Sequence, residues 1–132
     1  MPQLDRPGLE ARRRVLGDEY VDKALTGLDS FNAEFQALVT DYCWGKVWTR
    51  PTLSDKQRSL INLAMISALN RSDEFKTHVR GAIRNGCSVE EIRDTLMQVA
   101  IYAGIPAGVE AFRLARQVFE AEGVTPAPAD DA

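Results

Sequence analysis

The residues best suited to chemistry lie in one stretch of the sequence. Arg71, Glu74 and His78 are spaced at i, i+3 and i+7, which places them along one side of a helix or on the approach to it. His78 is the only histidine in the chain. One interpretation is a structural histidine that pairs with Glu74 across one helical turn. The other is an acid–base site, because an imidazole and a carboxylate can move protons and an arginine binds carboxylates.

A second polar pair lies just upstream, on an otherwise apolar helix. Arg58 and Asn62 are i, i+4 neighbours there, and a charge in such surroundings needs a partner or a cavity. If this helix packs beside the helix that carries His78, a guanidinium, a carboxylate and an imidazole converge in one pocket. That grouping suits a small anionic substrate.

Aromatic side chains form a third candidate group. Tyr42, Trp44 and Trp48 cluster near the end of a predicted helix, where such residues belong to a core or an interface more often than to a substrate wall. We take Trp44, Trp48 and Asn62 as candidate substrate-binding residues. Cys43 and Cys87 form neither a CxxC pair nor a zinc-like cluster, so no metal site is expected.

The elements that must position these residues are all helical. Helical spacing recurs, and no alternation long enough for a strand occurs. Capping-box patterns, Ser54 with Gln57 and Ser88 with Glu91, open two of the helices, and Gly86 closes another. We expect a compact all-α domain of about six helices, over about 8–16, 31–47, 54–69, 72–86, 88–103 and 106–122, with a short segment around 20–25.

Apolar residues indicate how these helices are covered. The 31–47 helix carries one apolar stripe made by Phe31, Phe35, Leu38, Val39 and Tyr42. The 54–69 helix is apolar around most of its circumference, which is typical of a helix buried on nearly all sides. A neighbouring subunit is the simplest source of part of that cover, and packing within one subunit is the alternative. Gly104 and Gly108 have the spacing of a close helix packing.

Length and charge narrow the class of protein. The 132 residues fit one domain over 1–123 with a loose tail at 124–132. The 16 basic and 19 acidic residues give a charge of −3, which argues against nucleic-acid binding, and we interpret the run Arg12 to Arg14 as a solvated helix face. The longest apolar run, 99–109, is interrupted by glycine and proline and cannot span a bilayer. With no signal peptide visible, we expect a cytoplasmic protein.

Four segments of the chain resemble the carboxymuconolactone decarboxylase family. They are YCWGKVWTRP at 42–51, RSL leading through ALNRSDEF to HVR at 58–80, NGCSVEEI at 85–92 and IYAGIPA at 101–107. The similarity covers about 15–119, nearly the whole chain. It implies an all-α fold assembled as a hexamer, typically a trimer of dimers. It also implies cofactor-free loss of carbon dioxide from 4-carboxymuconolactone, giving 3-oxoadipate enol-lactone in protocatechuate degradation.

The resemblance also separates this chain from a thiol peroxidase branch, the alkylhydroperoxidase D type. Arg71 and Glu74 stand where that branch has the two cysteines of CxxC, and His78 stands in its histidine position. Ser59 replaces its upstream glutamate. Without a thiol pair no resolving disulfide can form. The stretch Gly108-Val109-Glu110 departs from many decarboxylases, which leaves the substrate open.

Our mechanistic hypothesis joins the two polar groups. Arg58 and Arg71 would bind the developing oxyanion and a substrate carboxylate, and His78 would deliver a proton. Glu74 would orient the imidazole and keep it protonated. No metal or cofactor is required. The alternatives are a related enzyme acting on a small acid, a lactone or a hydroperoxide, and a non-catalytic oligomeric accessory protein.

Overall fold

The computed structural model describes residues 3–130 and confirms the all-α class. This part of the chain contains no strand. It forms seven α-helices and one π-helix, which directly follows the third α-helix. Contacts group the chain into two compact units, Met1–Arg58 (unit 1) and Ser59–Ala132 (unit 2), each described below by itself. The expectation of a single domain over 1–123 stays a prediction.

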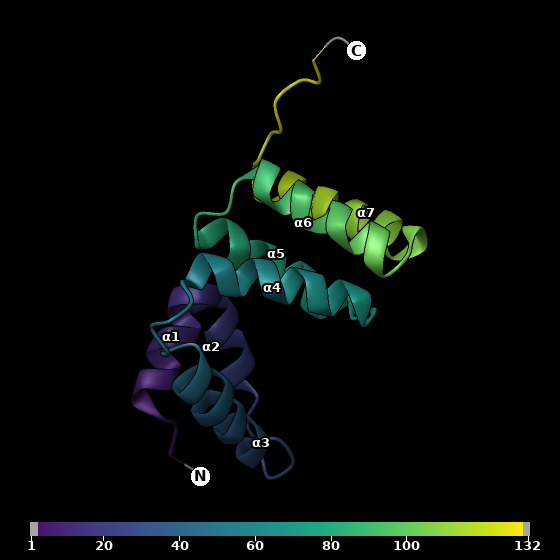
Figure 1. The fold of residues 1–132 in the computed structure, drawn as a ribbon. Coiled ribbons are helices and arrows are strands. Elements are labelled where there is room, and N and C mark those ends of the chain that lie inside the picture. Colours follow the sequence, from purple (N-terminus) through teal and green to yellow (C-terminus); the bar gives the residue numbers. More distant parts are fainter. Residues whose placement is uncertain (1–2, 131–132) are drawn as a thin grey trace. The chain divides into compact units, whose positions relative to one another are not determined.

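Unit 1 contains α1 (Arg6–Leu16), α2 (Asp18–Thr26), α3 (Ala33–Leu38) and the π-helix η1 (Val39–Val47), followed by the first residues of α4 (Asp55–Ala68) (Figure 1). The carboxylate of Asp5 caps α1 by accepting a hydrogen bond from the Gly8 amide at 2.8 Å. Gly17, at φ 90°, ends α1 in a conformation that favours glycine. These are the local signals that separate α1 from α2.

The packing of α1 against η1 depends on two glycines. A methyl group added at Gly8 would overlap the Thr40 carbonyl oxygen and lie 3.0 Å from the Gly45 amide nitrogen. The two helices therefore approach so closely that only small groups fit between them. Behind this contact, Trp44 and Trp48 stack with ring centroids 5.0 Å apart.

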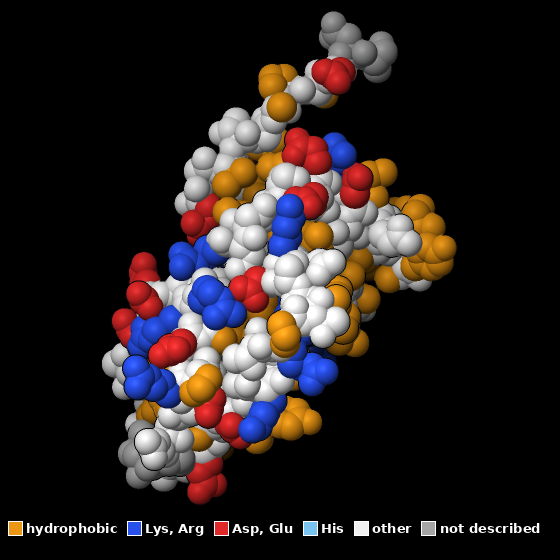
Figure 2. All heavy atoms as spheres, turned by 60° about the vertical axis from the view of Figure 1, so that its left-hand side comes forward, with side chains coloured by type: hydrophobic (Ala, Val, Ile, Leu, Met, Phe, Trp, Pro, Cys, Tyr) orange, Lys and Arg blue, Asp and Glu red, His pale blue; other side chains and the backbone are white. Residues whose placement is uncertain are grey.

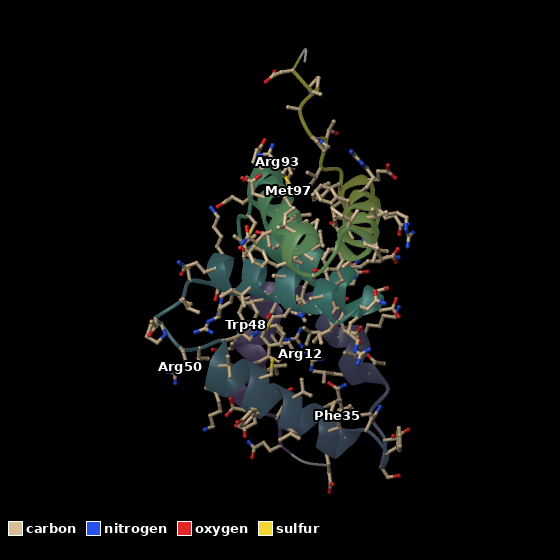
Figure 3. All side chains as sticks on the ribbon, turned by 45° about the vertical axis from the view of Figure 1, so that its right-hand side comes forward. Arg12, Phe35, Trp48, Arg50, Arg93 and Met97 are labelled. Atoms are coloured by element: carbon tan, nitrogen blue, oxygen red, sulfur yellow. The ribbon has the colours of Figure 1, made fainter. Side chains whose placement is uncertain are left out.

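The prediction of one continuous helix over 31–47 is wrong, because the segment is divided into α3 and η1. Most of its apolar stripe also lies outside the core of unit 1, whereas Val39 packs against that core. Phe31 is 94% exposed and Phe35, labelled in Figure 3, is 61% exposed. The buried side is instead made by Ala33, Thr40 and Trp44. The reason is the position of α1, whose Gly8 lies against Thr40 and whose Ala11 and Val15 pack against Trp44.

The solvated helix face predicted for the run Arg12 to Arg14 is also wrong for its first residue. Arg12 is only 6% exposed, and its Nη1 donates a hydrogen bond to Oε1 of Gln36 at 2.9 Å. Burial lowers the pKa of Arg12. Arg13 and Arg14 pair instead with carboxylates at the surface, for example Arg14 with Asp55 at 2.8 Å.

Unit 2 contains the rest of α4, then α5 (Ser72–Arg84), α6 (Val89–Tyr102) and α7 (Ile105–Ala121). Within it α7 packs against both α5 and α6, and α6 and α7 lie side by side in Figure 1. One apolar cluster joins all four helices, with Leu63, Phe75, Ile92, Leu96 and Leu114 among its buried members. This cluster holds α4 and α5 in place for the site described below.

The last described residues follow α7 as a non-helical segment. The Val124 amide donates to the Phe119 carbonyl oxygen at 2.8 Å, and Val124 packs on the unit 2 core. Residues 126–130 then line a hollow of about 410 Å³ together with α6 and α7. Arg93 borders this hollow, one turn before Met97 on α6 (Figure 3). The flexibility expected for 124–132 stays a prediction, and residues 131–132 lie outside the described part.

Charged groups are mixed on the surface. On the face drawn in Figure 2, Lys and Arg side chains alternate with Asp and Glu, and hydrophobic side chains reach the surface between them. Within residues 3–130, no helix has both the length and the hydropathy needed to cross a bilayer.

Candidate functional site

A polar seam between α4 and α5 brings two predicted site residues together. His78 Nδ1 lies 3.5 Å from the Asn62 amide nitrogen. Further along the same two helices, Nδ2 of Asn85 donates to Oγ of Ser59 at 2.8 Å. Since later residues of α5 meet earlier residues of α4, the helices run antiparallel. The two helices thus meet at these contacts within unit 2, whereas the convergence of a guanidinium, a carboxylate and an imidazole in one pocket stays a prediction.

The sequence explains why α4 offers polar groups to α5. On α4, Leu63 is fully buried and Leu60 and Ile66 pack against the same apolar cluster. Asn62 is half-buried beside these residues. A buried amide needs a hydrogen-bond partner, and the ring of His78 is the partner the structure provides. The seam is thus a narrow polar strip along an otherwise apolar helix pair.

His78 is half-buried, and its protonation follows from that burial. Desolvation lowers the pKa of His78, and the nearby Glu74 carboxylate opposes this shift without overcoming it. A pKa below the ordinary value makes the imidazole mainly neutral at pH 7. In this structure Glu74 does not offset the effect of burial, and its expected role in keeping His78 protonated stays a prediction. Glu74 itself is exposed on the first turn of α5.

Arg71 stands at the N-cap position of α5, on the same side of the helix as Glu74 and His78. Its side chain borders a small cavity of about 10 Å³, which is close to the size of one water molecule. Ser67 of α4 and Glu110 of α7 line the same cavity. Arg71 is exposed, so its guanidinium is available to an anion that approaches this end of α5.

Arg58 belongs to unit 1, one turn before Asn62 on α4. Its Nη2 donates to the Arg50 carbonyl oxygen at 3.2 Å. The Nε atom is buried and has no acceptor in the described part of the chain. A buried guanidinium nitrogen without an acceptor is unfavourable, and an anionic ligand would relieve it. Arg58 therefore stays a predicted anion-binding residue.

Both candidate tryptophans lie in the core of unit 1. Trp44 is 3% exposed and Trp48 is 5% exposed, and both pack against Ala11 and Val15 in the core of unit 1. This supports the core interpretation that the sequence already offered. Their role in substrate binding stays a prediction.

Sequence reasoning missed Asn85 as a member of the seam. Asn85 is the C-cap residue that follows α5, and it comes seven residues after His78, a spacing of about two helical turns that was the available signal. The expected absence of a metal stays a prediction. Among residues 3–130, no three His, Cys, Asp or Glu side chains are grouped closely enough to hold one.

Comparison with known proteins places the chain in a family. The profile of the carboxymuconolactone decarboxylase family matches residues 33–117. The chain belongs to this family. It is 38% identical to the 4-carboxymuconolactone decarboxylase of Acinetobacter baylyi over 124 residues, covering 94% of this chain and 92% of that protein.

Two further relatives support the assignment. The nitrosuccinic acid decarboxylase npaB of Metarhizium robertsii is 43% identical over 104 residues, which is 79% of this chain and 73% of the relative. A 4-carboxymuconolactone decarboxylase of Pseudomonas putida is 47% identical over 38 residues, 29% of this chain and 79% of the matched sequence. The protein is therefore a decarboxylase, a carboxy-lyase that acts on a small molecule.

Proposed function

We propose that this decarboxylase converts 4-carboxymuconolactone, or a closely related carboxylated lactone, to 3-oxoadipate enol-lactone during protocatechuate degradation. The observation that carries the proposal is the 38% identity with a 4-carboxymuconolactone decarboxylase over nearly the full length of both chains. The α4–α5 seam supplies groups suited to this chemistry, with an imidazole, an amide and a guanidinium on two adjoining helices. The reaction is proposed to need no cofactor.

The chemistry explains why such groups help. When carbon dioxide leaves, the electrons of the broken carbon–carbon bond move through a double bond to the lactone carbonyl, where negative charge develops. Fixed donors or cations near that oxygen lower the barrier, and one such donor contributes about 10²–10³ in rate. In our proposal Arg71 and Arg58 bind the anionic groups of the substrate, and His78 lies beside the atoms that react. Glu74 influences the imidazole through its charge. The carboxylate that leaves as carbon dioxide should not be bound tightly, because such binding would stabilise the ground state and not the transition state.

A second candidate substrate is nitrosuccinic acid or another nitro-substituted dicarboxylic acid. The 43% identity with a nitrosuccinic acid decarboxylase favours it. Loss of carbon dioxide next to a nitro group also moves negative charge onto oxygen atoms. The same donors can therefore serve both substrates, and the stretch at 108–110 that departs from many decarboxylases is a reason to test both.

We also propose that the enzyme works as a cytoplasmic homo-oligomer, with a hexamer built as a trimer of dimers as the expected form. One side of α4 supports this proposal. Ile61, Met65 and Leu69 are 43%, 51% and 64% exposed in the single chain. Apolar side chains that line one face of a helix without cover are typical of an interface.

The test is a parallel assay of the full-length protein with 4-carboxymuconolactone, followed by ultraviolet absorbance, and with nitrosuccinic acid, followed by carbon dioxide release. We expect turnover of the lactone. Arg71→Ala should lower kcat/KM by about 10²-fold or more, because a charge-assisted contact is lost. Arg84→Ala, at the other end of α5, is the matched control and should retain activity. Turnover of nitrosuccinic acid alone would replace the lactone proposal by the second candidate, and turnover of neither would refute both.

A further inference from the structure

The contact between Asn62 and His78 constrains the proton on the imidazole. The Asn62 atom that faces His78 Nδ1, at 3.5 Å, is the amide nitrogen. An amide NH₂ group can only donate a hydrogen bond. Nδ1 must therefore accept, and in a neutral imidazole the proton then lies on Nε2. Because the two nitrogens lie on different edges of the ring, this N–H is directed away from Asn62.

We propose that Asn62 is a positioning residue that holds His78 in its neutral Nε2–H tautomer, so that His78 donates a hydrogen bond to the oxyanion formed as carbon dioxide leaves. This inference rests on the proposed function. It replaces two assignments made from sequence, namely Asn62 as a substrate-binding residue and His78 as a proton-delivering imidazolium. Asn62 does not need to touch the substrate in this arrangement.

The step balances without proton transfer from His78. The carbon–carbon bond to the carboxylate breaks, its electron pair moves to the acceptor oxygen, and Nε2–H donates to that oxygen while keeping its proton. The carbon is then protonated by water. Overall, the substrate carboxylate and one water molecule give the protonated product and bicarbonate.

The environment of His78 favours this form over the imidazolium. Burial lowers the pKa of His78, which keeps the ring neutral at pH 7. On the α4 side the ring meets an amide and not a carboxylate, and an amide donor would be repelled by an N–H at Nδ1. A neutral imidazole is an established kind of hydrogen-bond donor to a developing oxyanion in enzymes. It needs no reorganisation of charge before the reaction.

The tautomer can be read directly because His78 is the only histidine. Protein labelled with ¹⁵N in the imidazole gives a single pair of ring nitrogens, without any substrate. At pH 7 we expect a pyridine-like shift for Nδ1 and a pyrrole-like shift for Nε2. A pyrrole-like Nδ1, or a fully protonated ring, would overturn the inference even if the protein is a decarboxylase.

Substitution at Asn62 tests the cause. In Asn62→Asp the carboxylate can only accept, so the proton should move to Nδ1 or the ring should become imidazolium, and kcat should fall by about 10²–10³-fold. Gln117→Glu, an exposed position on α7, makes the same change of charge and should leave both tautomer and kcat unchanged. An Asn62→Asp protein with the parental tautomer would refute the positioning role. The expected tautomers without turnover of either substrate would instead refute the proposed function and leave the positioning role supported.

Discussion

The contact between Gly108 of α7 and Ala100 of α6 allows a quantitative test of how unit 2 is packed. A methyl group added at Gly108 would lie 2.6 Å from the Ala100 methyl carbon and 3.1 Å from its Cα. Carbon atoms in ordinary contact are about 3.5–4.0 Å apart. Gly108→Ala thus requires the two helices to separate by about 1 Å, at the position where the sequence predicted a close helix packing.

The expected free energies follow from two opposing effects. Overpacking a well-packed site costs about 1–3 kcal/mol, whereas alanine in place of glycine within a helix stabilises by about 0.8–1 kcal/mol. Gly108→Ala should therefore lower the free energy of unfolding by about 0–2 kcal/mol. Ala100→Gly should lower it by about 1 kcal/mol. In the double variant the 2.6 Å overlap with the methyl carbon is removed and only the 3.1 Å approach to Cα of residue 100 remains, so most of the lost stability should be restored.

Urea denaturation followed by far-ultraviolet circular dichroism measures all four proteins of this cycle. The two single changes predict a summed loss of about 1–3 kcal/mol, and restoration in the double variant gives a coupling of the same size. Independent sites add within about 0.5 kcal/mol. A coupling below that value would mean that α6 and α7 are not in the contact described, and the reasoning would fail.

Two further predictions concern His78 and a helix cap. Because the pKa of His78 is lowered in the folded protein, the unfolded chain binds a proton near its ordinary pKa of about 6.5 that the folded chain does not, so stability is lost as pH falls. His78→Gln should remove this loss of stability, which is at most about 1.4 kcal/mol per pH unit. Urea titrations of both proteins between about pH 7.5 and 5.5 would measure the difference. The same pH dependence of stability in both proteins would contradict the prediction. Ser88→Ala should cost about 1 kcal/mol, because the Ser88 side chain accepts from the Glu91 amide at 3.0 Å, and an unchanged denaturation midpoint would argue against the cap.

The starts of α4 and α6 and the end of α5 could be predicted because their signals are local. Ser88 and Glu91 form both hydrogen bonds of the predicted capping box, and Ser54 and Gln57 form the corresponding pair at the start of α4. Gly86 has φ 85° after α5, the conformation expected of a C-terminal glycine. Each of these signals depends on residues within one helical turn, so no knowledge of the tertiary structure was needed.

The inner face of α3 and η1 could not be predicted for the opposite reason. The apolar stripe through Phe31 and Phe35 has ideal spacing, yet the face that turns inward carries Ala33 and Thr40. That choice is set by Gly8, more than thirty residues earlier in the chain, which brings the α1 backbone against Thr40. Periodicity identifies the faces of a helix, but the neighbouring helix decides which face is buried.

Sequence reasoning named both His78 and Asn62 but did not pair them, and the membership of the candidate site stays a prediction. Spacing along one helix suggested that Glu74 would be the partner of His78, because i, i+4 pairs are visible in sequence. The partner in the structure is Asn62, on the antiparallel helix. Such a pair depends on the register between two helices, which the sequence does not display. The protonation of His78 follows from the same register, because burial between helices lowers its pKa more than Glu74 raises it.

Positions 71 and 74 distinguish this chain from the thiol peroxidase branch that its sequence resembles. In the resembling peroxidase branch these positions carry the two thiols of a redox pair, whereas here they carry a guanidinium and a carboxylate on the same side of α5. Exchange of thiols for charges removes the capacity for disulfide chemistry at these two positions, and it fits our proposal that the site acts by electrostatic stabilisation. Decarboxylation suits that change, because its main requirement is to stabilise negative charge as it moves onto oxygen. The backbone of α4 and α5 fixes where these groups stand, and the side chains decide what the site can do.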